Sequence, residues 1–424
     1  MIKTLRPLIF ILIISGLSFG QNDTLTINQC VDLALKNNPQ IRLAQSNYDL
    51  NYSNLVITRS NIFPQISLQS GWNRNGGTFF QGPVAIPRTF ETYTAGFQGS
   101  LLLYDFQKTY SRISAFSELT DASAQDFINA KQTLILNTYI AYFDYLQAVK
   151  LKIVSEQSLQ QATEHLKLSR SLFEVGSKPQ FDVIKAESDE ATARVNLLNA
   201  ENNIDITRLQ LENILNKKLP SSFNLKDEFE VVRDSVTESQ SLSTAFQYRP
   251  EIIAAKFRVE ANKSLLTSAW AANFPSVYAS GGYTWKSFAL SQTFQGSWSL
   301  GVALTLPIFQ GFALDAGIQQ ARANLDNVQA GYDLTEQSVT LDVRQQYSNL
   351  RLSMNQITAS RSLLKAAEET LRLAEARFKE EVGSAVEVTD ARVAYYNAQV
   401  LLIQTLYNYQ VTYARLERAM GTLK

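Results

Sequence analysis

The sequence has very few of the residues that most often carry chemistry in proteins. Its 424 residues include one cysteine, Cys30, and one histidine, His165. A lone cysteine allows neither an internal disulfide nor a cysteine-based metal cluster, and a lone histidine leaves little room for His-dependent catalysis. No glycine-rich phosphate loop is present, so we predict a protein that is not an enzyme and has no cofactor. We interpret Cys30 as a small buried residue on a helix and His165, which follows Glu164, as a solvated helix position.

The chain also lacks net charge and, after its start, long apolar runs. Lysine and arginine total 39, as do aspartate and glutamate, which argues against nucleic-acid binding. Residues 1–20 have the pattern of a signal peptide, with Lys3 and Arg6 before an apolar stretch and the small residues Ser18 and Gly20 at a cleavage site. No later run reaches the roughly 18 apolar residues of a transmembrane helix. Such an exported chain is either soluble outside the cytoplasm or crosses an outer membrane as a β-barrel.

Proline and glycine are missing from long stretches of the chain. No proline lies between Pro87 and Pro179 or after Pro307, and no glycine lies between Gly99 and Gly176. These stretches are rich in good helix formers, with apolar residues three and four positions apart. Helices of this length need partners, so coiled-coil packing is expected. The predicted long helices cover about 107–175, 180–215, 311–379 and 385–420.

The sequence repeats itself once. Thr26–Ile41 matches Thr237–Ile252 at an offset of 211, and Leu168–Ala186 matches Leu373–Ala391 at an offset of 205. Both copies open with Thr-x-x-Gln, a capping-box pattern, followed by a proline where a second helix would begin. We therefore predict two tandem repeats joined by a polar connector. The expected bounds are 21–215 for the first repeat, 216–236 for the connector in an equatorial region, and 237–424 for the second repeat.

Ten of the 18 glycines lie in two short windows, 71–99 and 281–301. Around them the apolar residues alternate with polar or small ones, which is the pattern of a two-faced strand. We predict β-hairpins at about 64–105 and 275–307. Their pattern suits strands of an outer membrane barrel, and it also suits hairpins packed on a soluble core. Four strands cannot close a barrel, so a barrel requires several copies in a ring, and three copies would supply twelve strands.

Three segments give the chain a specific resemblance. They are "ALKNNPQI" (Ala34–Ile41), "LTLPIFQGFALDAGIQQA" (Leu304–Ala321) and "RFKEEVGSAVEVTDAR" (Arg377–Arg392). With the repeated helix–hairpin–long helix plan, the chain resembles the TolC-like outer membrane efflux protein family over nearly its whole mature length.

The resemblance implies a mainly α-helical fold with a membrane β-barrel. It implies a homotrimer that forms a 12-stranded barrel in the outer membrane of a Gram-negative bacterium, above a periplasmic helical tunnel. The implied partners are outer membrane lipid, a periplasmic adaptor protein and an inner-membrane RND or ABC transporter, for efflux or type I secretion. The alternative from the residues alone is a periplasmic coiled-coil spacer without channel activity. The transported substance is not readable from the sequence.

The turns between the paired long helices are the candidate functional region. Gly176 and Gly383 would supply the backbone freedom of a tight reversal. The resemblance implies that such tips meet the adaptor. The candidate docking residues are Val175, Gly176, Ser177, Val382, Gly383 and Ser384. An ungapped repeat alignment sets Glu381 opposite Gly176, so either the second turn has another shape or the register is shifted by two residues.

Two acids follow the second tip. Glu387 and Asp390 match the pair that lines the pore constriction in the family, with one acid changed to Glu, whereas the first repeat has Asp182 and Lys185 there. In a trimer the pair would form a ring of carboxylates, which favours cations. We expect a cation-selective, acid-sensitive constriction. The alternative is that both acids only stabilise the start of their helix through its dipole.

Overall fold

The computed structural model describes residues 24–81, 83–220, 223–227 and 237–424. The predicted signal peptide lies outside these ranges, as do residues 221–222 and 228–236 of the predicted connector. The described chain is mainly α-helical with one four-stranded antiparallel sheet and one two-residue parallel ladder. The expected fold class, long helical hairpins with four strands, is confirmed.

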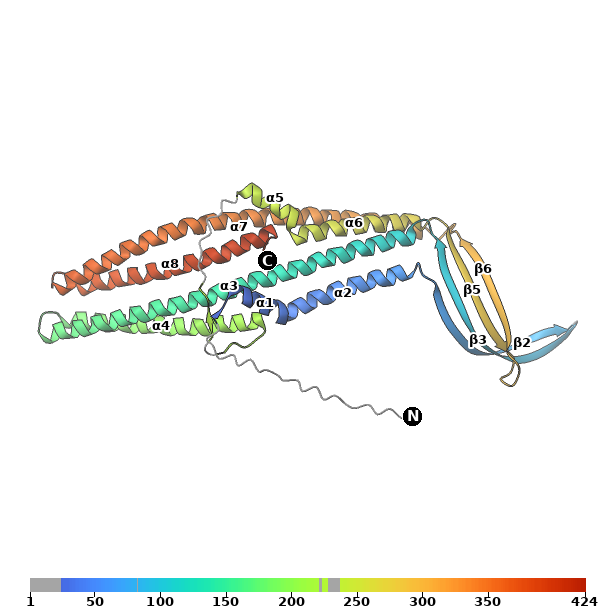
Figure 1. Cartoon of the computed structure of the whole chain (residues 1–424), viewed down its shortest axis with the longest axis horizontal. Helices are drawn as coiled ribbons and strands as arrows, with labels where there is room; N and C mark the ends of the chain where they lie inside the picture. The colour runs from blue at the N-terminus through green and yellow to red at the C-terminus, as the bar shows by residue number, and fades with distance from the viewer. Residues whose placement is uncertain (1–23, 82, 221–222, 228–236) are drawn as a thin grey trace, which may run out of the picture.

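Two halves of the chain have the same order of elements (Figure 1). The first half contains α1 (Ile27–Asn37), α2 (Pro39–Ser60), β2 (Gln65–Gln81), β3 (Val84–Tyr104), α3 (Lys108–Glu174) and α4 (Gln180–Leu215). The second contains α5 (Glu238–Tyr248), α6 (Pro250–Ala271), β5 (Ser276–Ser287), β6 (Gln295–Thr305), α7 (Ala313–Lys379) and α8 (Ala385–Met420). The short strands β1 (Thr24–Leu25) and β4 (Asn224–Leu225) pair in parallel near the middle.

The helix starts follow from local sequence. Thr26 and Thr237 each accept a hydrogen bond from the backbone N–H three residues on. The side-chain oxygen of the Gln at that position accepts one from the backbone N–H of the threonine, so both capping boxes are confirmed. Pro39 and Pro250 occupy the first positions of α2 and α6, where a missing N–H costs little.

The long helices form two antiparallel hairpins, α3 with α4 and α7 with α8. α3 and α7 have 67 residues each, which corresponds to about 100 Å at ~1.5 Å per residue. Alanines such as Ala115, Ala141 and Ala148 are buried along α3, and small side chains let neighbouring helices approach closely. The largest apolar core surrounds Tyr142, whose hydroxyl donates to the backbone of β1. Cys30 is fully buried in this core on α1, as predicted.

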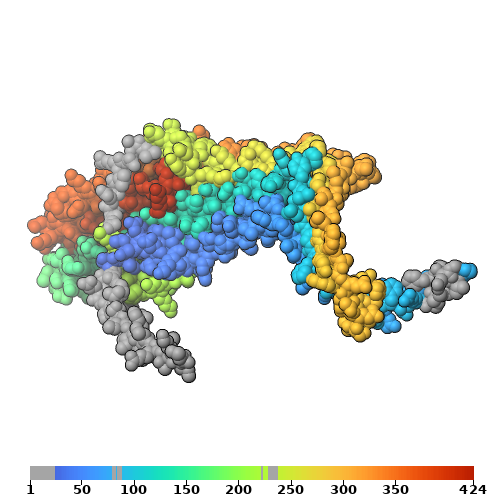
Figure 2. Space-filling view, turned by 45° about the vertical axis from the view of Figure 1, so that its right-hand side comes forward, coloured from blue at the N-terminus to red at the C-terminus, as the bar shows by residue number. Residues whose placement is uncertain are grey.

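The sheet has the order β2-β3-β5-β6, with every neighbouring pair antiparallel. It extends from one end of the helical body, and the helices do not cover its faces (Figure 1; Figure 2). Large apolar side chains are therefore exposed on it, such as Trp298 (77%) and Leu300 (79%). The alternative in which the hairpins pack on a soluble helical core is wrong for this chain.

The helices that adjoin the sheet follow the same order as its strands. α2 packs on α3, α3 on α6 and α6 on α7, and these helices connect directly to β2, β3, β5 and β6. In the described chain, β2 and α2 thus lie at one edge of the molecule, whereas β6 and α7 lie at the other.

Candidate functional site

The two helical tips turn in the same way. Gly176 has φ +79°, and the N–H groups of Gly176 and Ser177 donate to Phe173 and Leu172. The second tip repeats this 205 residues later, with Glu381 at φ +62°. The N–H groups of Glu381 and Val382 donate to Phe378 and Arg377. The ungapped alignment therefore has the correct register, and a glutamate adopts the left-handed conformation that usually favours glycine.

Gly383 is glycine for another reason. It is not among the positive-φ residues, so the expectation that it supplies conformational freedom is wrong. An added Cβ would lie 2.9 Å from the backbone nitrogen of Phe378, too close for any side chain. The carbonyl of Gly383 accepts a hydrogen bond from Nζ of Lys178 at 3.2 Å, and Lys178 lies 4.9 Å over the ring of Phe378. The first tip is thus joined to the second.

Five of the six predicted docking residues are exposed. Val175 and Val382 project from the two tips with 74% and 71% of their surfaces accessible. Gly176, Ser177 and Ser384 are also exposed, whereas Gly383 is buried beneath the turn.

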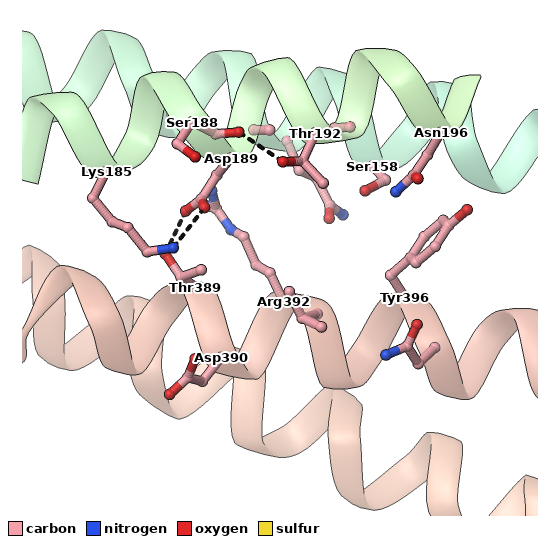
Figure 3. Close-up of a pocket in the computed structure, with 15 residues that line it drawn as sticks. Ser158, Lys185, Ser188, Asp189, Thr192, Asn196, Thr389, Asp390, Arg392 and Tyr396 are labelled. Carbon is pink, nitrogen blue, oxygen red and sulfur yellow. Dashed lines mark hydrogen bonds and ion pairs between the residues drawn. The ribbon is translucent and has the colours of Figure 1, made fainter. Parts of the chain in front are cut away.

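The two predicted gate acids lie on the first turns of α8. Ser384 caps this helix by accepting from the N–H of Glu387 at 3.2 Å. Glu387 is exposed, 3.6 Å from Nε of Arg377. Asp390 is also exposed, and its carboxylate is turned away from α4 (Figure 3). The first-half counterpart of Glu387, Asp182, is buried, so only the second tip presents two accessible acids.

Beside Asp390, a polar seam joins the two hairpins. Lys185 and Asp189 of α4 form an ion pair at 3.1 Å, and the hydroxyl of Thr389 on α8 donates to Asp189 (Figure 3). A cavity of about 450 Å³ lies between α3, α4 and α8 along this seam, and Asp390 lines it. Further along, Ser155 and Tyr396 share a hydrogen bond of 3.2 Å.

His165 is part of the same seam, and its predicted solvated position is wrong. The side chain is buried with 4% exposure, and its ring lies 5.0 Å from that of Phe378 on α7. Burial, together with the charge of Arg392, lowers the pKa of His165 to about 4, although Asp189 opposes this. His165 is therefore neutral at pH 7. Arg392 itself is held by Glu375, with Nη2 at 2.8 Å.

Sequence reasoning missed the seam because its contacts join residues about two hundred positions apart. Asp189 and Thr389 belong to no local motif, and Lys185 was singled out only as the non-acidic counterpart of Asp390. Arg392 was named only as the end of a matching segment. The one available signal was helical periodicity, which places His165 and Ser169 four residues apart on one face of α3.

The described chain contains no group of three His, Cys, Asp or Glu side chains placed to hold a metal ion. None of its described helices has an apolar stretch long enough to span a bilayer.

Comparison with known proteins defines the class. The chain is 24% identical to outer membrane protein TolC of Escherichia coli over 99% of this chain and 87% of that protein. It is 22% identical to the protease secretion protein PrtF of Dickeya chrysanthemi over 99% of this chain and 93% of that protein. The solved Campylobacter jejuni CmeC outer membrane channel superimposes with a TM-score of 0.84 at 20% identity, covering 93% of this chain and 85% of that one. The fold is thus that of an outer membrane channel.

The family follows from the sequence itself. The model of the outer membrane efflux protein family matches residues 30–217 and 241–422. The chain belongs to this family, and the resemblance predicted from the sequence is confirmed. It is a protein of the outer membrane of a Gram-negative bacterium and acts in efflux.

Proposed function

We propose that the protein is the passive outer conduit of a tripartite efflux or type I secretion system. The observation that carries this proposal is the sheet. Its four strands expose apolar side chains and leave the edges of β2 and β6 without a partner in the described chain. Unpaired edges are not tolerated in lipid, so the strands complete their hydrogen bonding with other copies.

A homotrimer satisfies this requirement. Three copies supply twelve strands, an even number within the range of outer membrane barrels. The helices that adjoin the sheet have the same order as the strands, so one rotation closes a barrel and a helical tunnel together. A continuous water path then runs through the assembly, and transport through it needs no energy source of its own.

The tips are the proposed entrance. Three copies bring six carboxylates from Glu387 and Asp390 toward one axis, and such a ring favours cations and repels anions. Both acids are accessible, and among the residues that the structure describes only Glu387 has an ion-pair partner, Nε of Arg377 at 3.6 Å. The competing explanation is that both acids only stabilise the start of α8 by interacting with its helix dipole, typically by 0.3–1 kcal/mol each.

The exposed tip residues are the proposed contact with a periplasmic adaptor, through which an inner-membrane transporter would deliver its substrate. Val175 and Val382 are the apolar anchors, with Gly176, Ser177 and Ser384 around them. Exposed apolar side chains at the end of a rigid hairpin suit a protein partner. Gly383 drops out of this surface because it is buried.

Planar-bilayer recording of the detergent-purified mature protein tests the conduit and its gate. We expect ion conductance with a preference for cations. In the double variant Glu387→Gln/Asp390→Asn, the cation-to-anion permeability ratio falls toward one. Glu369→Gln is the control, because this exposed acid pairs with Arg372 on its own helix. A protein that is monomeric and soluble without detergent would refute the conduit, and unchanged selectivity in the double variant would refute the gate.

A further inference from the structure

The junction between the two halves of one chain, where β3 pairs with β5, has a counterpart in the two outer edges of the sheet. α1, α2 and β2 correspond to α5, α6 and β5 at an offset of 211, whereas α3 and α4 correspond to α7 and α8 at 205. The strand pairing obeys the same offsets, because Gln65 opposite Ser100 becomes Ser276 opposite Thr305. Inside the chain, β3 pairs with β5. The equivalent pair is β6 with β2, which are the two free edges.

From this equivalence we infer that β6 of one copy pairs with β2 of the next in the register of the β3–β5 junction. The inference rests on the proposed ring of copies and specifies which residues meet in it. Phe97 lies opposite Tyr283 within the chain, so Val302 lies opposite Trp72 of the neighbouring copy. By the same offsets, Thr305 lies opposite Gln69 of that copy.

Two glycines at the internal junction show why the register matters. An added Cβ at Gly96 would lie 2.5 Å from the carbonyl oxygen of Tyr283, and one at Gly282 would lie 2.9 Å from that of Phe97. Both distances are too short for a side chain, so the two strands approach each other only because these residues are glycine.

The counterparts of these two residues at the free edges are also glycines, Gly301 and Gly71. Nothing in the described part of their own chain requires this, because an added Cβ would meet its nearest atom at 3.9 Å from Gly301 and 3.5 Å from Gly71. A neighbouring strand in the inferred register supplies the missing reason, since it would bring a backbone carbonyl as close as at Gly96.

Other sheet glycines have no glycine counterparts. Those that meet no backbone atom of a neighbouring strand closer than 3.6 Å correspond to ordinary residues in the other half. These pairs are Gly99 with Leu304, Gly281 with Ser70, and Gly76 with Ser287. Gly296 corresponds to Glu91, and an added Cβ there would clash with the side chain of Tyr283. Glycine is thus kept in both halves only where the β3–β5 junction forbids a Cβ.

Placing the next copy in this register also covers exposed apolar side chains beside the sheet. Within the chain, Phe274 stacks on Phe106 with ring centroids 5.2 Å apart. The counterpart of Phe274 is Phe63, which is 60% exposed. The counterpart of Phe106 is Gly311, so the equivalent placement brings Phe63 of the next copy to the segment 309–312. This segment carries the exposed Phe309 and Phe312, whose rings contact each other at 5.6 Å.

The corresponding helices α6 and α2 show the same difference between the internal junction and the outer edge. Ala254 and Ala261 of α6 are fully buried. Their counterparts on α2, Leu43 and Leu50, are mostly exposed in the single chain. Packing of α2 on α7 of the adjacent copy would bury these leucines as the internal junction buries the alanines.

Paired cysteine substitutions test the register directly. Opposite residues on antiparallel strands lie within disulfide reach, whereas residues displaced by two do not. We expect Trp72→Cys/Val302→Cys to give covalently linked dimers and trimers on oxidation. The pair Ser70→Cys/Val302→Cys should not. Phe97→Cys/Tyr283→Cys is the matched internal control and should cross-link without a change in the number of chains. Cys30 contributes little background because it is buried and its thiol pKa is raised to about 12.

A matched glycine pair gives a second readout. Gly301→Ala should lose the oligomer on size-exclusion chromatography in detergent while the helical circular dichroism is unchanged. Gly99→Ala should keep the oligomer, because its added Cβ meets ordinary contacts of 3.7 Å and more.

The possible outcomes separate this inference from the proposed function. A conducting oligomer that cross-links in the shifted pair, or that tolerates Gly301→Ala, overturns the register and leaves the conduit standing. A correctly cross-linked ring that conducts no ions supports the register and refutes the conduit.

Discussion

In the first half of the chain the link between the two short helices is Asn38, whereas in the second half it is Arg249, 211 residues later. Nδ2 of Asn38 donates to the carbonyl of Ile214, and Nη1 of Arg249 donates to the carbonyl of Ala419, the counterpart of Ile214. The two halves thus make the same backbone contact with different side chains. Repetition has kept the geometry of the joints and allowed their chemistry to change.

The second joint contains a buried charge, which needs counter-charges around it. Arg249 is buried and pairs with Asp342 at 2.8 Å and Glu251 at 3.3 Å. Arg418 also pairs with Glu251 at 2.9 Å. Asn38 instead uses its side-chain oxygen to cap α2 through the N–H of Gln40, a neutral contact that needs no counter-charge. A buried ion pair loses more than a neutral hydrogen bond when one partner is removed.

We expect the largest difference in stability between substitutions at these two joints. Arg249→Ala should lower the free energy of unfolding by about 3–5 kcal/mol, because it leaves the partly buried carboxylate of Asp342 without its cation and Glu251 with Arg418 alone. Asn38→Ala should cost about 2 kcal/mol, from one cap and one buried hydrogen bond. Urea denaturation followed by circular dichroism measures both. The exposed pair of Arg258 with Asp126 provides the control, since Arg258→Ala should cost at most about 1 kcal/mol. Equal losses at Asn38 and Arg249 would contradict the comparison.

The next effect depends on pH and belongs to one half alone. His165 is buried in α3, whereas its counterpart Thr370 is exposed on α7 and bonded to its own helix. The folded pKa of His165 is about 4, below its usual 6.5. The neutral form therefore stabilises the fold above pH 6.5, and this contribution is lost as the pH falls through 6.5 toward 4. The loss amounts to about 3 kcal/mol at most.

Urea denaturation at pH 7.5 and pH 4.5 checks this sign. The wild type should lose more stability on acidification than His165→Gln, which keeps a polar side chain but cannot take up the proton. Thr370→Gln is the matched change in the other half and should leave the pH dependence of the wild type intact. An identical pH dependence of the wild type and His165→Gln would show that other groups are responsible.

The smallest effect concerns the tips. Gly176→Ala should destabilise the first tip by about 1 kcal/mol, because alanine resists a positive φ. Glu381→Gly should be neutral or stabilise the second tip by less than about 1 kcal/mol, since relief of strain is offset by a more flexible unfolded chain. Thermal unfolding compares the two variants with the wild type. A neutral Gly176→Ala or a destabilising Glu381→Gly would mean that the two turns, alike in φ and hydrogen bonds, differ in what holds them.

Local sequence patterns determined most of the skeleton. The absence of proline and glycine over 107–175 predicted a helix that the structure places at Lys108–Glu174. The alternation around Trp72 and Trp298 predicted strands that are present. The capping boxes at Thr26 and Thr237 were readable for the same reason, since helix propensity, strand alternation and capping depend on residues only a few positions apart. The two offsets, 211 and 205, were also visible in the sequence.

Only the tertiary structure decided what the side chains of the hairpin tips meet. It buried His165 against Phe378 and joined Lys178 of the first tip to the carbonyl of Gly383 in the second. The physical reason is that burial and close approach depend on which helix lies alongside. That neighbour comes from the other half of the chain, about two hundred residues away, where no local pattern records it.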